Sequence, residues 1–239
     1  MTTDSVTPRH RDPQPYKTNA PPYQPRPLSP RELRVLDTYA FRSPKNRRVV
    51  TVVDPARLAL ALAHDFNPHI KWYVERPRTI TVSERPVELC FWYAMIGGEE
   101  RFDLLTNQKE PTVHAVRRAE RQTAMTFEAA ATAGLTLQIR KYSYFLSWRI
   151  ANTGRLQLLP YVQASRDLLN ADAVEQAVQQ HLIATPRTSF YAIERALAAF
   201  KPCDVRAQVC TMIHRGSLCI DLTTRLTLGS PVWQQGAAP

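Results

Sequence analysis

The chain has 239 residues, enough for one large domain or two small ones, and its hydrophobic fraction of 44% is ordinary for a globular protein. Its formal net charge of +10 favours an anionic polymer as partner, with nucleic acid as the leading candidate. No apolar run approaches the roughly 18 residues needed to span a bilayer, so we expect a cytoplasmic protein without a membrane partner.

The N-terminal residues 1–35 are expected to form a disordered, basic, proline-rich arm. Pro, Arg, Tyr and Gln dominate its first 30 residues, and no helical or strand period is visible. Such a segment buries too little apolar surface to offset the entropy of ordering it. The arm is either a docking segment for a partner or a solvated tail.

Residues 36–157 are predicted to form an α/β domain. Asp54 followed by Pro55 is typical of a helix start, and the apolar pattern continues to about residue 64. A second helical pattern over 112–133 ends at Gly134. Extended segments are expected at 47–53, 70–74, 78–82, 87–96, 101–106 and 135–139, and a further apolar segment covers 144–150. Gly97-Gly98 predicts a tight hairpin between 87–96 and 101–106.

Residues 158–239 are predicted to form a smaller C-terminal unit. Helical patterns cover 171–184, 189–200 and 203–214, and an extended segment follows at 217–222. The last helix has one apolar stripe, made of Val205, Val209 and Met212. Three short helices and a terminal hairpin are the outline of a winged helix.

Neither the cysteines nor the histidines show metal-ligand spacing. The four cysteines contain no CxxC pair, so we expect neither a zinc site nor disulfides. The six histidines are scattered and include no HExxH motif.

The predicted hairpin ends in a pattern that is typical of a nuclease strand. In PD-(D/E)xK enzymes, one hairpin strand brings an Asp to a divalent metal, and its partner brings (Asp/Glu/Gln)-x-Lys alongside. Here the second strand continues into Asn107-Gln-Lys109, and the first has Trp92 and Tyr93 where the Asp is expected. Mg²⁺ requires anionic oxygens, so an aromatic ring and an amide leave too few ligands.

The order of these elements resembles the TnsA endonuclease subunit of heteromeric cut-and-paste transposons, over roughly residues 53–232. A helix leads to a segment ending at Pro77, then to a glycine-turn hairpin ending in x-x-Lys, a long helix ending in Ala133-Gly134, and a strand. Residues 209–222 are similar to the winged-helix ending of that family. The resemblance implies an α/β fold with a restriction-endonuclease-like mixed sheet flanked by helices, followed by a small winged-helix domain.

The family resemblance also implies an activity and partners. It implies a Mg²⁺-dependent nuclease that cuts at transposon ends beside a separate transposase subunit, with an AAA+ regulator as a further partner. The implied site combines a Glu of the first helix, an Asp of the first hairpin strand and (Glu/Gln)-x-Lys on the second. Only Lys109 matches this pattern, and Asn107 stands two positions before it. Asp54, the one acid within 53–57, is expected to cap the helix.

Asp103 is the remaining candidate ligand. It lies an even number of residues before Asn107 and Lys109, so a regular strand places all three side chains on one face. These three residues are therefore the candidate catalytic set of a rearranged site. Alternatively, Asp103 is a solvent-facing or salt-bridged residue near a hairpin end, and Lys109 is a solvated lysine or a phosphate contact.

Basic side chains supply the candidate DNA contacts. Arg117, Arg118 and Arg121 fall within one and a half turns of the long predicted helix, and Arg140-Lys141 follows the next strand. Such a run is either a solvated helix face or a phosphate-binding surface.

These patterns favour a TnsA-like subunit that binds double-stranded DNA in a transposition complex and has a degenerate active site without a cofactor. One alternative is an active Mg²⁺-dependent endonuclease with rearranged ligands, and a second is a winged-helix transcription regulator. We expect the residues before 158 to carry most of the DNA affinity and the unit from 158 onward to dock proteins.

Overall fold

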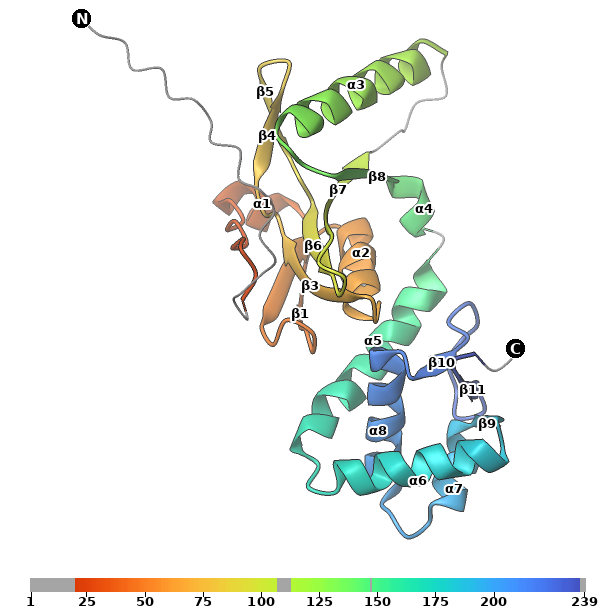
Figure 1. Cartoon of the computed structure of the whole chain (residues 1–239). Helices are drawn as coiled ribbons and strands as arrows, with labels where there is room; N and C mark the ends of the chain where they lie inside the picture. The colour runs from red at the N-terminus through yellow and green to blue at the C-terminus, as the bar shows by residue number, and fades with distance from the viewer. Residues whose placement is uncertain (1–19, 107–112, 147, 237–239) are drawn as a thin grey trace, which may run out of the picture.

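The computed structural model describes residues 20–106, 113–146 and 148–236 of the chain. In this part the protein is α/β, with a mixed four-stranded sheet in an upper unit and a lower unit that is mainly helical (Figure 1). None of the helices within these ranges combines the length and apolar character needed to cross a membrane.

The central sheet has the strand order β3-β6-β7-β8. Its strands are β3 (Ile70–Glu75), β6 (Phe91–Met95), β7 (Glu100–Thr106) and β8 (Leu137–Lys141). The first three are antiparallel neighbours, and β8 runs parallel to β7. Parallel neighbours need a crossover connection, which helix α3 (Val113–Thr132) supplies.

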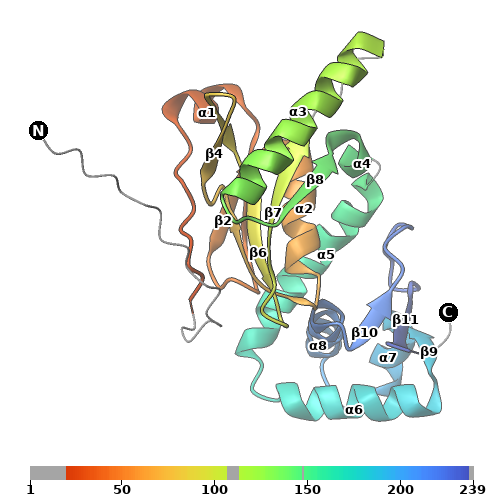
Figure 2. The same cartoon turned by 45° about the horizontal axis from the view of Figure 1, so that its top comes forward.

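Both faces of this sheet are buried. Alternation along β6 places Phe91 and Tyr93 in the apolar cluster that includes helix α2 (Pro55–Asp65), and Trp92 in a second cluster with Ala130 of α3. Figure 2 shows α2 and α3 on opposite sides of β6 and β7. A polar side chain on the α2 face therefore needs a partner inside the protein.

Two small hairpins accompany the central sheet. Strand β1 (Thr38–Arg42) pairs with β2 (Val49–Val53), and β4 (Thr79–Val82) pairs with β5 (Arg85–Glu88). The predicted single strand over 87–96 is wrong, because β5 ends two residues before β6 begins. The intervening Leu89 and Cys90 are buried, so the apolar run continues across the break without a turn signal.

The predicted helix ends and the predicted hairpin are confirmed. Asp54 caps α2 by accepting a hydrogen bond from the backbone N–H of Arg57 at 2.8 Å. Gly134 follows α3 with a φ of 68°, and Gly98 takes a φ of 87° in the tight turn between β6 and β7. The strand predicted over 135–139 lies two residues later, as β8.

Part of the predicted disordered arm is packed on the upper unit. Helix α1 (Pro30–Val35) starts at Ser29 with a capping box, and the backbone N–H of Arg26 donates to the carbonyl oxygen of Arg76 at 3.2 Å. The Tyr23 ring lies 5.4 Å from the ring of Trp92, centroid to centroid. The prediction of disorder is therefore wrong for residues 20–35, because these contacts hold the proline-rich segment against the upper unit. Residues 1–19 lie outside the described residues.

The lower unit consists of short helices and a three-stranded antiparallel sheet in the order β10-β11-β9. Its helices are α5 (Arg149–Ala164), α6 (Ala171–Ala184), α7 (Phe190–Ala196) and α8 (Pro202–Arg215), with a 3-10 turn η1 (Ser165–Asp167) after α5. Its strands are β9 (Arg187–Ser189), β10 (Leu218–Ile220) and β11 (Pro231–Gln234). The short helix α4 (Tyr142–Leu146) precedes α5.

Helix α5 belongs to both units. Leu159 packs into the apolar cluster of the upper unit, whereas Leu158 and Val162 pack into the cluster of the lower unit. The predicted domain boundary at 157/158 is therefore wrong, because it cuts a continuous helix whose two faces serve two cores. The Pro160 inside this helix obscured its pattern in the sequence.

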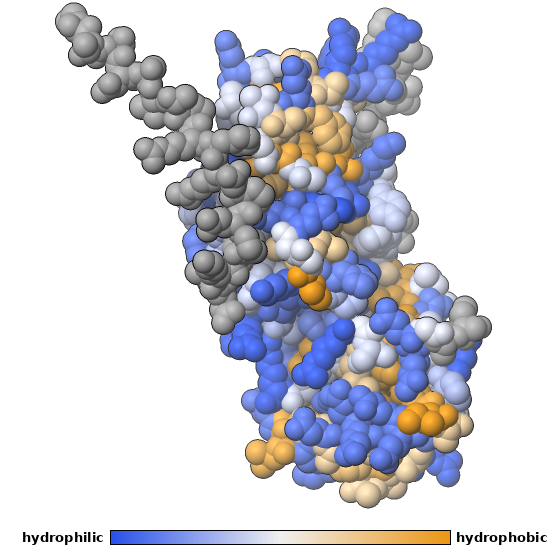
Figure 3. All heavy atoms as spheres, viewed as in Figure 1, coloured by the Kyte–Doolittle hydropathy of each residue, from blue (hydrophilic) through white to orange (hydrophobic). Residues whose placement is uncertain are grey.

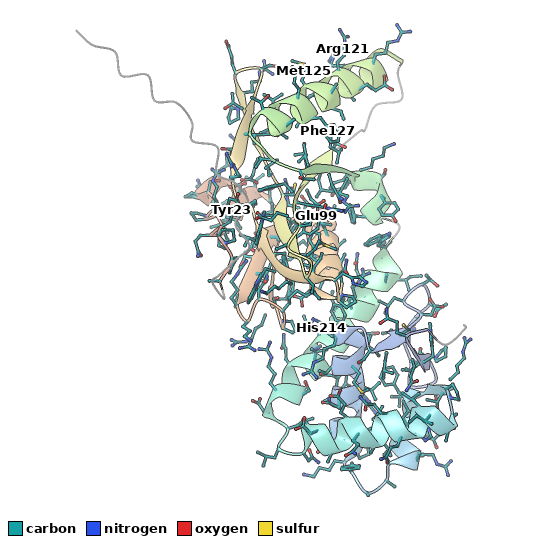
Figure 4. The ribbon with its side chains drawn as sticks, in the orientation of Figure 1. Tyr23, Glu99, Arg121, Met125, Phe127 and His214 are labelled. Atoms are coloured by element: carbon teal, nitrogen blue, oxygen red, sulfur yellow. The ribbon has the colours of Figure 1, made fainter. Side chains whose placement is uncertain are left out.

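The two units also meet at the end of α2. Asp65 accepts hydrogen bonds from the Tyr73 hydroxyl at 2.7 Å and from His214 Nε2 of α8 at 2.8 Å. Next to this pair, Gly216 has a φ of 81°, and a Cβ on it would lie 2.6 Å from the Pro68 ring. Figure 4 shows His214 at this junction.

Candidate functional site

The candidate site is built around Asp103 on β7. Its side chain is fully buried on the α2 face, where His64 Nε2 donates to Oδ2 at 2.8 Å and Arg140 Nε donates to Oδ1 at 3.0 Å. An ionised carboxylate only accepts hydrogen bonds, so this contact assigns the proton to Nε2 of His64. Both carboxylate oxygens are therefore occupied by donors of the protein itself.

Neighbouring strands extend the polar cluster. The Tyr93 hydroxyl donates to Gln138 Oε1 at 2.8 Å, and Arg140 Nη2 donates to the same oxygen. Burial and the charge of Asp103 raise the pKa of Tyr93, while the nearby guanidinium groups of Arg140 and Arg101 oppose that rise. Tyr93 therefore remains a neutral hydrogen-bond donor at neutral pH.

A cavity of about 380 Å³ opens beside this cluster. Its lining includes the polar side chains of His64, Gln138, Arg101 and Arg140, and an aromatic wall made of Tyr144, Phe145 and Trp148. The Tyr144 and Trp148 rings meet edge to face with centroids 5.0 Å apart. The volume lies within the roughly 300–1,000 Å³ that is usual for small-molecule sites.

The residues at this position do not fit the Mg²⁺ that the resemblance implies. On β6, Trp92 donates its indole N–H to Glu100 Oε2 at 2.7 Å, and Tyr93 points its hydroxyl at an amide. Asp54 caps α2 and forms an ion pair with Arg57. Across residues 20–106, 113–146 and 148–236, no three side chains of His, Cys, Asp or Glu are grouped so as to hold a metal ion.

The predicted catalytic set is only partly visible. Asn107 and Lys109 lie outside the described residues. Asp103 is salt-bridged, as one alternative held, but the expectation that it faces solvent is wrong, since its side chain is 0% exposed. Asp103 is buried because both faces of the sheet are covered at this point of β7, where Phe102 and Leu104 are buried as well.

The predicted DNA contacts fall in two places. Arg117, Arg118 and Arg121 are exposed on α3, and Figure 4 shows Arg121 about midway along that helix. Figure 3 shows hydrophilic side chains at this end of the molecule. Arg140, in contrast, lines the cavity and bonds inside the protein, while Lys141 beside it is exposed. Arg140 is therefore separated in its contacts from the exposed arginines of α3.

Sequence reasoning missed His64, Gln138, Tyr93 and Arg101 as members of one site. His64 and Asp103 are 39 positions apart, and Arg140 is 37 positions from Asp103, so no local spacing connects them. The one available signal was a polar pair, His64-Asp65, at the end of a helix that is otherwise apolar on its buried face.

Comparison with known proteins adds no relative: no protein-family model matches the sequence, and no curated protein matches it.

Proposed function

We propose that this protein is a DNA-binding subunit of a transposition complex, built on a PD-(D/E)xK-like domain whose metal site is degenerate. The observation that carries the proposal is the strand order β3-β6-β7-β8 with α2 before β3 and α3 between the parallel strands β7 and β8. Helix, strand, hairpin, helix and strand follow one another in the order that the resemblance to TnsA implies. The hairpin β4–β5 is an insertion between the first two strands of that core.

The chemistry of the site supports binding rather than cleavage. The carboxylate of Asp103 forms an ion pair with Arg140 and accepts a hydrogen bond from His64, and the opposite strand supplies Trp92 and Tyr93 in place of an acid. A metal ion would have to displace His64 or Arg140 from Asp103, and it would then gain a single carboxylate as its anionic ligand. The net charge of +10 remains available for attraction to DNA phosphates.

The lower unit supports a winged-helix assignment with a protein-docking role. The order α6, β9, α7, α8, β10, β11, with β9 paired to β11, supplies the three helices and the hairpin of that fold. Helix α8 is buried along most of its length, and α5 packs on it through Leu158 and Val162. A helix covered in this way cannot enter a major groove, which disfavours the transcription-regulator alternative. A transposase subunit and an AAA+ regulator are the proposed partners.

Fluorescence anisotropy on a duplex of about 30 base pairs tests this proposal. If the chain neutralises about four to six phosphates, log K should fall against log salt with a slope of roughly −4 to −5. Replacing Arg117, Arg118 and Arg121 by Ala should make the slope shallower by about 2 to 3 if each arginine contacts one phosphate. Arg195→Ala, on α7 of the lower unit, is the matched control and should leave the slope unchanged. Absence of binding at low salt refutes the proposal.

A cleavage assay separates the proposal from the active-endonuclease alternative. Supercoiled plasmid is incubated with the full chain and Mg²⁺ or Mn²⁺, beside the Lys109→Ala variant. We expect no nicking by either protein. Nicking by the wild type that is lost in Lys109→Ala favours an active enzyme with rearranged ligands.

A further inference from the structure

We propose that the cavity beside Asp103 binds one unpaired nucleotide unit, with the base against the aromatic wall and the phosphate at Arg101. This inference rests on the proposed function, because it names the part of a DNA substrate that the pocket takes. The ligand chemistry is shared by an unpaired terminal nucleotide of DNA and by a free nucleotide, and the test below distinguishes the two sources.

The aromatic wall provides a stacking surface of fixed orientation. The Phe145 ring meets Trp148 edge to face at 5.1 Å, and the guanidinium of Arg155 lies over the indole ring, 5.2 Å from its centroid. Tyr144 meets the indole edge to face. A ring fixed in this way offers a base a platform without loss of side-chain entropy, and stacking on aromatic rings tolerates all four bases.

The lining of the cavity also has the polar groups that a nucleotide needs. Gln138 and His64 present an amide and an imidazole on the cavity side, and Arg140 is fixed by its bonds to Asp103 and Gln138. Arg140 is paired with the buried Asp103, so Arg101 is the cavity cation whose carboxylate partner is exposed. The pocket therefore combines apolar and polar walls in the way that a base with its phosphate requires.

Arg101 forms an ion pair with Glu99, and this pair is exposed to solvent. Its Nε and Nη2 donate to the two carboxylate oxygens of Glu99, each at 2.8 Å, but the Glu99 side chain is 53% exposed in the turn after β6. An exposed ion pair contributes little stability, so a phosphate can replace Glu99 on Arg101. Figure 4 shows Glu99 in the middle of the upper unit.

A duplex does not fit a cavity of about 380 Å³, whereas one unpaired nucleotide does. The first measurement compares two DNA duplexes with the full chain at one salt concentration. One duplex carries a single unpaired 2-aminopurine at its end, and the other carries the same base paired in a blunt end. We expect about tenfold tighter binding of the unpaired end and a change of its fluorescence on stacking.

Variants then locate the effect. Trp148→Ala should abolish the preference for the unpaired end, and Trp148→Phe should largely retain it. Trp233→Ala is the control, since Trp233 lies on β11 beneath Arg187 in the lower unit. Glu99→Gln should strengthen binding of the unpaired end a few-fold, which tests the pocket even where Trp148→Ala fails to fold. Arg101→Gln should weaken it.

The outcomes separate this inference from the proposed function. Equal binding of the two duplexes, with no binding of free dAMP in a calorimetric titration, overturns the pocket assignment and leaves DNA binding intact. Binding of free dAMP that is lost in Trp148→Ala, together with absence of duplex binding at low salt, supports a free-nucleotide site and overturns the proposed function.

Discussion

The last turn of α2 places two consecutive residues in two buried carboxylate–histidine hydrogen bonds, and the second partners of the two carboxylates differ in how exposed they are. His64 donates to Asp103 beside the cavity, and Asp65 accepts from His214 at the junction of the two units. The second partner of Asp103 is Arg140, whose side chain is 38% exposed, whereas the second partner of Asp65 is the fully buried Tyr73. The same type of carboxylate–histidine contact thus lies beside a ligand-sized cavity at Asp103 and at the junction of the two units at Asp65.

The environment of Asp65 accounts for its structural role. Burial alone raises the pKa of a carboxyl group, but hydrogen bonds from His214, Ser43 and Tyr73 hold the pKa of Asp65 below its usual value. The ionised form is therefore the form that joins α2 to α8. Asp103 is equally buried, but one of its partners, Arg140, is partly exposed to solvent.

The largest expected effect is that of Asp65→Ala. Removing this acceptor leaves the Tyr73 hydroxyl and His214 without their partner in a buried place, so we expect the free energy of unfolding to fall by about 3–5 kcal/mol. Urea denaturation of the full chain measures this change. Asp37→Ala, at an exposed position, is the control and should change stability by less than about 0.5 kcal/mol.

Asp103→Ala should cost less. The Arg140 side chain is 38% exposed and can be rehydrated, so we expect a loss of about 1–3 kcal/mol in the same urea experiment. A loss as large as that of Asp65→Ala would show that the two pairs are equivalent and would remove the distinction between junction and site.

A smaller effect concerns Lys45, near Asp65. Burial lowers the pKa of Lys45 to about 8, and the charge of Asp65 opposes this shift only in part. Between pH 8 and 10.5 the unfolded chain then holds more protons than the folded one, so the contribution of Lys45 to stability rises with pH. We expect this contribution to grow by about 1 kcal/mol from pH 8 to 9.

The difference between the wild type and Lys45→Met isolates this contribution from the cysteines and tyrosines that titrate in the same range. Lys45 keeps its hydrogen bond to the carbonyl oxygen of Ile70, 2.7 Å long, in either protonation state. Identical pH slopes for the two proteins would show that Lys45 is not desolvated.

The sequence predicts elements where a local rule decides them. Asp54-Pro55 and Gly134 determine helix ends through backbone chemistry, and Gly97-Gly98 determines a turn, so these predictions agree with the structure. Tertiary packing determines the elements that the sequence does not predict. Leu89 and Cys90 pass between two sheets without leaving the core, and the order of residues 20–35 depends on contacts such as Tyr23 with Trp92.

The site was less predictable than the fold. Asp103 was a candidate because of its spacing within one strand, which is a local property. Its actual partners come from α2 and β8, and only the parallel pairing of β7 with β8 brings Gln138 opposite Asp103 and Arg140 beside it. Long-range register of this kind leaves no trace in a short stretch of sequence.

The most direct test of the central claim, that Asp103 serves an ion pair rather than a metal, is a calorimetric titration of the full chain with Mn²⁺. Because Asp103 already accepts from His64 and Arg140, and β6 contributes no acid, the account predicts no metal site tighter than the millimolar range. A micromolar Mn²⁺ site that disappears in Asp103→Ala would contradict it.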